Sequence, residues 1–247
     1  MADKGSQQSG DMKVFYWLMG AVVLIAVAGV AWSVTRNVAT NAATEPLEME
    51  FADAQELVRA AVGVERGDPN APITIMEFGD YQCPACGAFA TRVKPQVDLA
   101  FVQSGIAKFV FQDFPLRQHP HAFLAARAAR CALDQGSDYY WPYHDQLFQH
   151  QTSWSSSATP PISNFEGYAE AIGLDVEEFS ACLNSDKFAD VVTANMHLGL
   201  AMNVSGTPTI FVSKGGGIAT RVNEWGDVRE FERIINQMLE ADSGGQD

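Results

Sequence analysis

The chain of 247 residues is poor in cysteine and in basic side chains. Of its four cysteines, two form the single C-x-x-C motif, Cys83-Pro84-Ala85-Cys86. A zinc site with this spacing normally needs a second cysteine pair, and no second C-x-x-C is present, so a redox role is favoured over a metal. Lysine and arginine number 16 against 30 acidic residues, a formal net charge of −14. Such an acidic surface excludes nucleic acid as a partner.

Charge is missing altogether from residues 14–34, a run of 21 positions. This run is long enough to span a bilayer, and aromatic residues lie near both of its ends. A cleaved signal peptide would have a shorter apolar region followed by a small-x-small site, and no such site follows residue 34. The sequence therefore predicts an uncleaved transmembrane anchor at 14–34, which places the protein in a membrane, after a disordered cytoplasmic tail at 1–13.

The C-x-x-C motif lies where a strand turns into a helix. Residues 73–78 favour a buried strand, and apolar residues at four-residue steps after Pro84 favour one face of a helix. Cys83 would then lie at the helix N-terminus, where free backbone N–H groups and the helix dipole stabilise a thiolate. Cys86, one turn further, is close enough to attack a mixed disulfide formed at Cys83. This arrangement is what thiol–disulfide exchange requires.

The remaining pattern predicts an α/β domain at 67–241. A second strand at 107–114 follows the first helix, which Pro95 interrupts, and the strand–helix–strand unit makes a parallel crossover. Helical patterns fill an insertion at about 119–203, and β-structure returns as a hairpin near 208–222. These strands are followed by a last helix, and 242–247 is a polar tail.

The segment 35–66 reads as a linker with a short helix. Asp53 is a candidate N-cap, with Glu56 at the third helical position, as in a capping box. At about 35 residues this segment is too short to form a separate dimerisation domain. We therefore expect a monomer.

Several motifs in order resemble the DsbA-like thiol:disulfide oxidoreductases of the thioredoxin superfamily, in their membrane-tethered or exported bacterial branch. The motifs are Glu77-Phe78-Gly79-Asp80-Tyr81-Gln82-Cys83-Pro84-Ala85-Cys86, Phe114-Pro115-Leu116, Ala128-Ala129-Arg130-Cys131, Tyr143-His144 and Gly206-Thr207-Pro208-Thr209. The resemblance covers about residues 66–240. It implies a thioredoxin fold split by an inserted α-helical domain.

The resemblance also implies roles for single residues. Cys83 looks like the exposed nucleophile and Cys86 like the resolving cysteine of a redox-active disulfide. Pro208 resembles the family's cis-proline, with the backbone of Thr207 presented to substrate. Glu77 resembles a buried carboxylate that exchanges a proton with Cys86, although a solvated strand position is the alternative.

One position departs from the family. Many DsbA proteins have histidine as the second residue between the cysteines, where it stabilises the thiolate, and this chain has Ala85. We therefore expect this protein to be a milder oxidant than the DsbA proteins that have the histidine. His119 and His121 flank Pro120 at a helix start, where a capping or solvated role is favoured over metal binding.

Cys131 and Cys182 lie far apart in the helical insertion. An even cysteine count in an exported domain favours a structural disulfide between them, and two free buried thiols are the alternative. Four cysteines fit two disulfides, which persist outside the cytoplasm. The domain is therefore expected on the extracytoplasmic side, periplasmic or at the cell surface.

The function expected from these features is an oxidase that introduces disulfides into exported cysteine-containing polypeptides. No cofactor is required, and the resemblance implies reoxidation by a quinone-linked membrane oxidase. One alternative is a disulfide isomerase or reductase of the same fold. Another is a non-enzymatic, membrane-tethered binding or chaperone protein in which Cys83–Cys86 is only structural.

Overall fold

The computed structural model describes residues 17–20, 23–25 and 42–240. Residues 17–20 and 23–25 are helical, and the rest of the expected anchor at 14–34 and both expected tails lie outside the described residues. Within the described part of the chain, no helix is both long enough and apolar enough to cross a membrane. The compact domain that follows begins at Ala43.

A five-stranded mixed sheet with the order β1-β3-β2-β4-β5 forms the centre of the domain. The strands are β1 (Val64–Arg66), β2 (Ile73–Gly79), β3 (Ala107–Asp113), β4 (Thr209–Lys214) and β5 (Thr220–Val222). The central strand β2 pairs in parallel with β3 and antiparallel with β4. Ile73, Ile75 and Phe78 of β2 are fully buried, as expected for a central strand covered on both faces.

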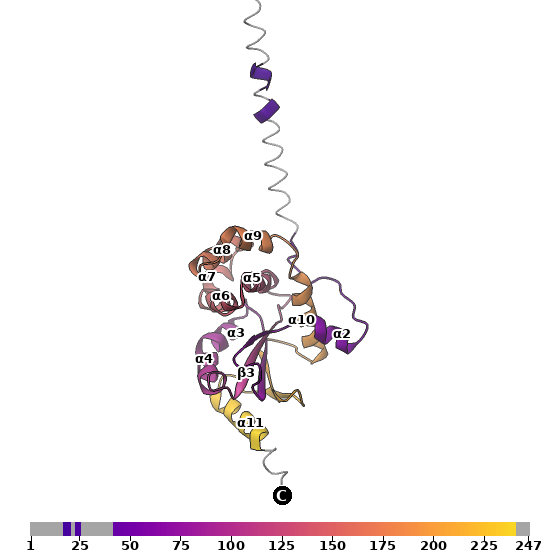
Figure 1. Ribbon diagram of the computed structural model, residues 1–247, viewed down its shortest axis with the longest axis vertical. Coiled ribbons are helices and arrows are strands. Elements are labelled where there is room, and N and C mark those ends of the chain that lie inside the picture. The colour runs from indigo at the N-terminus through magenta and orange to yellow at the C-terminus, as the bar shows by residue number, and fades with distance from the viewer. Residues whose placement is uncertain (1–16, 21–22, 26–41, 241–247) are drawn as a thin grey trace, which may run out of the picture. The chain divides into compact units, whose positions relative to one another are not determined.

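Helices cover the sheet and form a separate layer beyond it (Figure 1). They are α2 (Ala54–Ala60), α3 (Pro84–Ala88), α4 (Lys94–Val97), α5 (Ala122–Asp134), α6 (Ser137–Gln149), α7 (Gln151–Trp154), α8 (Ile162–Ala171), α9 (Val176–Leu183), α10 (Ala189–Ala201) and α11 (Val228–Glu240). Figure 1 shows α5 to α9 gathered at one end of the domain and α11 at the other. The insertion between β3 and β4 thus consists of helices and the loops between them, as the sequence predicts.

The helix after the C-x-x-C motif is not one regular helix. Two π-helical segments, η1 (Phe89–Val93) and η2 (Asp98–Val102), alternate with α3 and α4. Pro95 lies in the first turn of α4, where its missing N–H is tolerated. The interruption expected at Pro95 is therefore present, and it takes the form of widened turns on both sides of α4.

Local capping signals identify helix starts correctly. The Asp53 carboxylate accepts the N–H of Glu56 at 2.8 Å, and the Glu56 carboxylate accepts the N–H of Ala52 at 2.6 Å. Asp175 likewise accepts the N–H of Glu178 at 2.9 Å. One strand was not expected: Val64–Arg66 lies in the segment read as linker, yet it forms the antiparallel edge strand β1 beside β3. Its three residues are too few to show an alternating pattern.

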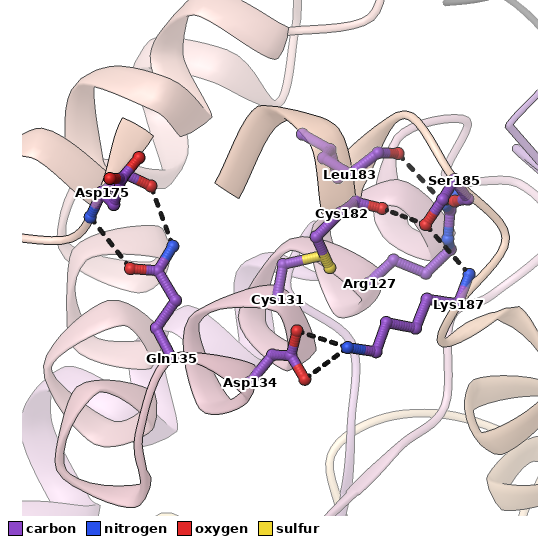
Figure 2. Close-up of a disulfide and its surroundings, with 9 residues drawn as sticks. All are labelled: Arg127, Cys131, Asp134, Gln135, Asp175, Cys182, Leu183, Ser185 and Lys187. Carbon is purple, nitrogen blue, oxygen red and sulfur yellow. Dashed lines mark hydrogen bonds and ion pairs between the residues drawn. A yellow bond between two sulfur atoms is a disulfide. The ribbon is translucent and has the colours of Figure 1, made fainter. Parts of the chain in front are cut away.

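A disulfide joins two helices of the insertion. Cys131 of α5 and Cys182 of α9 are bonded with an S–S distance of 2.05 Å, across 51 positions of sequence. Figure 2 shows polar contacts around it, among them Arg127, which donates to the backbone carbonyl of Leu183 at 3.0 Å. Lys187 pairs with Asp134 at 2.6 Å close by. The disulfide and these contacts hold α9 against α5.

Replacing both Cys131 and Cys182 by alanine should destabilise the domain. Because the bond closes a loop of 51 residues, its loss should lower the free energy of unfolding by about 4 kcal/mol in the chain-entropy model. Urea denaturation of the double variant and of the native chain measures this difference. Equal unfolding free energies would show that the bond does not restrict the unfolded chain.

Candidate active site

The C-x-x-C motif lies at the end of the central strand. β2 ends at Gly79, a short turn follows, and Cys83 is the N-cap of α3 with Pro84 at the first helical position. Cys83 is 7% exposed and Cys86 is fully buried, and both are free thiols. Only Cys83 can therefore be approached from outside.

The surroundings of Cys83 favour its thiolate. The pKa of Cys83 is lowered to about 5, chiefly because the Cys86 thiol can donate a hydrogen bond to it. The Thr207 side chain and the backbone N–H groups of Ala85 and Cys86 also stabilise the thiolate, whereas burial opposes it. The N–H groups are the unpaired donors of the first turn of α3, as the position of Cys83 at a helix N-terminus predicts.

Cys86 has the opposite environment. Burial raises its pKa well above the ordinary value of a thiol, and its hydrogen bond to Cys83 acts in the same direction, as does the charge of Glu77 once that carboxyl group is ionised. The backbone N–H of Asp80 contacts the Cys86 sulfur at 3.4 Å. At neutral pH the reduced site therefore holds one thiolate, at Cys83, and one thiol, at Cys86.

Thr207 and Pro208 lie against the nucleophile. The Thr207–Pro208 peptide bond is cis, and the Cys83 thiol contacts the Thr207 backbone carbonyl at 3.4 Å. The segment directly precedes β4, which pairs with β2, so the sheet brings residues 124 positions apart in sequence together here. Thr207 thus presents backbone and side-chain groups beside the Cys83 sulfur.

Glu77 is a buried carboxyl group that interacts electrostatically with both cysteines. It lies in β2 between Phe111 of β3 and Ile210 of β4, is fully buried, and neither of its side-chain oxygens has a hydrogen-bond partner. Burial raises its pKa to about 8, although the positive charge of Lys94 opposes this shift. Glu77 is therefore protonated at neutral pH, and the reading of it as a solvated strand residue is wrong.

Two glutamines that the sequence did not single out connect the active-site turn to the helical insertion. The Gln151 amide of α7 donates to the carbonyls of Tyr81 at 2.7 Å and Cys83 at 2.8 Å. The Gln82 amide donates to the carbonyl of Ser155 at 2.6 Å. These contacts hold the backbone of the active-site turn against the helical insertion. No local pattern signals them because the partners lie about 70 positions away.

Asp80 is a further site residue that no local sequence pattern singles out. Its buried carboxylate accepts the N–H of Gln82 at 2.7 Å, the N–H of Leu116 at 2.8 Å and the His119 imidazole at 2.7 Å. His119 was expected only to cap or solvate a helix start. The sequence signal that could have identified the Asp80–His119 pair is the acidic residue between the end of the strand and the C-x-x-C motif.

The structure brings the expected residues Cys83, Cys86, Thr207, Pro208 and Glu77 to one place. Cys131 and Cys182 lie apart from it, in the insertion. Among the residues that the structure describes, no group of three or more His, Cys, Asp or Glu side chains is arranged to hold a metal ion.

Comparisons with known proteins agree with this geometry. A protein-family model described as thioredoxin matches residues 60–236. Disulfide bond formation protein D of Bacillus subtilis is 29% identical over 175 residues, which cover 71% of this chain and 76% of that protein. The crystal structure of oxidised BdbD from Bacillus subtilis superposes with a TM-score of 0.65 at 26% identity, covering 74% of this chain and 95% of that one. Wolbachia pipientis α-DsbA1 has the same fold, with a TM-score of 0.65 at 20% identity over 72% of this chain and 92% of that one.

Much longer proteins also contain similar sequence. The Na(+)/H(+) antiporter NhaA 3 of Salinispora tropica is 29% identical over 201 residues, 77% of this chain. The chain spans only 29% of the length of that antiporter.

The fold and the site together define a DsbA-like thiol:disulfide oxidoreductase domain. Three features place the domain in this class: the helical insertion, the C-x-x-C motif at a helix N-terminus, and the cis-proline segment beside that motif. The chain belongs to the thioredoxin family.

Replacing Glu77 by glutamine should change how stability depends on pH. The carboxyl group ionises near 4.5 in the unfolded chain but only near 8 in the folded protein. Ionisation therefore favours the unfolded chain, and the native protein loses stability as pH rises through this window, on the order of 4 kcal/mol in total.

The Glu77→Gln variant lacks this loss, so its stability relative to the native chain should rise between pH 4.5 and 8. Urea denaturation of both reduced proteins across this range measures it, and the subtraction removes the contribution of Cys83, which is common to both. A stability difference that does not change with pH would contradict the buried, protonated Glu77.

Proposed function

We propose that the protein is an extracytoplasmic oxidase that introduces disulfides into exported polypeptides. The observation that carries this proposal is the contrast between the two sulfurs, with a pKa of about 5 at Cys83 and a strongly raised pKa at Cys86. A stabilised thiolate favours the reduced form of the pair, so the Cys83–Cys86 disulfide is ready to accept electrons.

The exchange proceeds in two steps. A substrate thiolate attacks the Cys83 sulfur, the Cys83–Cys86 bond breaks, and Cys86 leaves with the electron pair. The substrate's second thiolate then attacks the substrate sulfur of the mixed disulfide, forms the substrate disulfide, and releases Cys83 as a thiolate. Two electrons pass from substrate to the cysteine pair, and no cofactor takes part. The low pKa of Cys83 makes it the better leaving group in the second step.

Glu77 supplies the proton that the first step needs. A thiolate at the buried Cys86 is unfavourable, because burial and the neighbouring charges raise its pKa. Glu77 is protonated near neutral pH and interacts electrostatically with Cys86, so it can transfer a proton to the leaving sulfur. Thr207 next to the cis Pro208 offers its backbone to the substrate chain beside Cys83.

The cellular setting is part of the same proposal. The apolar segment 14–34 anchors the chain in a membrane, and the Cys131–Cys182 bond fits an oxidising compartment. A quinone-linked membrane oxidase returns the Cys83–Cys86 pair to the disulfide form. The domain works as a monomer.

Two substitutions test the chemistry. The native chain in its disulfide form should oxidise a reduced, unfolded model protein, and Cys83→Ser should abolish this activity. Cys86→Ala, incubated with the disulfide-containing form of the model protein, should instead accumulate a covalent mixed disulfide between Cys83 and that protein, visible by mass on a non-reducing gel. The Cys83 thiolate exchanges with the disulfide of the model protein and releases one of its thiolates, and no Cys86 is present to release the captured chain. The Cys131→Ala, Cys182→Ala double variant is the control, and it should retain oxidation at temperatures where it stays folded.

Each other result indicates a different function. If the native chain binds the model protein without oxidising it, and the Cys83→Ser variant binds it with the same affinity, the protein is a scaffold. Efficient reshuffling of wrong disulfides without net oxidation would indicate an isomerase.

A further inference from the structure

The two residues between the cysteines, Pro84 and Ala85, have no ionisable side chain. Any positively charged side chain beside Cys83 is therefore supplied by another element of the fold. The loop after β3 carries His119 to the active-site turn, where its Nδ1 atom lies 2.7 Å from the Asp80 carboxylate.

Asp80 connects this histidine to both cysteines. Its backbone carbonyl accepts the N–H of Cys83 at 3.1 Å, and its own N–H contacts the Cys86 sulfur at 3.4 Å. Its side chain is fully buried, whereas that of His119 is 19% exposed. The carboxylate therefore fixes the position of the imidazole, which still reaches solvent and can exchange protons.

The charges around His119 favour its protonated form. Its pKa is raised, first by the hydrogen bond to Asp80 and also by the negative charge of Cys83, while partial burial opposes the shift. His119 also lines a groove of about 1000 Å³. The other titratable or charged side chains on the groove wall are Glu45, Glu48, Arg117, His121 and His197.

We propose that the His119 imidazolium, held by the buried Asp80 carboxylate, stabilises the Cys83 thiolate of the reduced protein and so makes the Cys83–Cys86 disulfide more oxidising. This inference rests on the proposed function, in which the pair accepts electrons from substrate. His119 is a positioning residue, since it acts on the stability of the Cys83 thiolate and takes no part in bond exchange. It supplies from a distant loop the positive charge that the C-x-x-C motif lacks.

Removing the charge should raise the pKa of Cys83. In His119→Gln the cation is lost and the Asp80 carboxylate is left without its counter-charge, and both changes disfavour the thiolate. A nearby charge shifts a pKa by one unit or more. The pH midpoint of Cys83 alkylation in the full-length reduced chain should therefore rise by about one unit. This is a tenfold decrease in the ionisation constant of the Cys83 thiol. Cys86 does not interfere because it is fully buried.

Two further variants separate charge from structure. His119→Lys keeps a cation at the position and should hold the alkylation midpoint near the native value. His197→Gln is the matched control, because it removes another imidazole from the same groove without touching Asp80, and its midpoint should equal that of the native chain. A shift in His119→Lys as large as in His119→Gln, or no shift in either, would overturn the proposal. An equal shift in His197→Gln would also overturn it.

A measurement on the unsubstituted protein gives a second test that does not depend on variants folding. Coupling between two groups is reciprocal, so the His119 pKa must be higher in the reduced protein, which has the thiolate, than in the disulfide form. Nuclear magnetic resonance titration of the His119 ring in both forms measures this, and equal values would overturn the proposal. Neither test uses substrate oxidation, so a chain that fails to oxidise a model protein but shows these shifts would contradict only the proposed function.

Discussion

The contrast between the two sulfurs of the C-x-x-C motif is the constraint on which the site depends. Cys83 meets the free N–H groups at the start of α3, while Cys86, one turn on, is enclosed by the core. The same helix start thus produces a thiolate and a thiol only three positions apart. Bond exchange at Cys83 needs both, because the buried Cys86 takes up the electron pair when the Cys83–Cys86 bond breaks, and the stable Cys83 thiolate then leaves easily from the mixed disulfide.

The rest of the fold holds this helix start in place. The central strand brings Asp80 to the turn, the sheet brings Thr207 beside Cys83, and the helical insertion sends Gln151 to the backbone of the turn. The Cys131–Cys182 bond lies within that insertion. Its contribution to the site is therefore indirect, since it stabilises helices that in turn support the active-site backbone.

The sequence predicted the parts of the site that depend on local patterns. The strand before Cys83, the helix after it and the cap at Asp53 are all signalled by residues within a few positions. The contacts of Gln151 and His119 could not be predicted, because they join segments that only the folded sheet and insertion bring together. The short strand β1 was missed for a related reason, since its pairing with β3 defines it more than its own residues do.

Equilibration of the protein with glutathione buffers, with Cys83–Cys86 followed by mass, tests the central claim most directly. A stabilised Cys83 thiolate predicts a reduction potential well above the roughly −270 mV of thioredoxin, while Cys131–Cys182 stays oxidised throughout. A potential near that of thioredoxin would contradict the oxidase and indicate a reductase. Complete lack of exchange would contradict a redox role for the pair altogether.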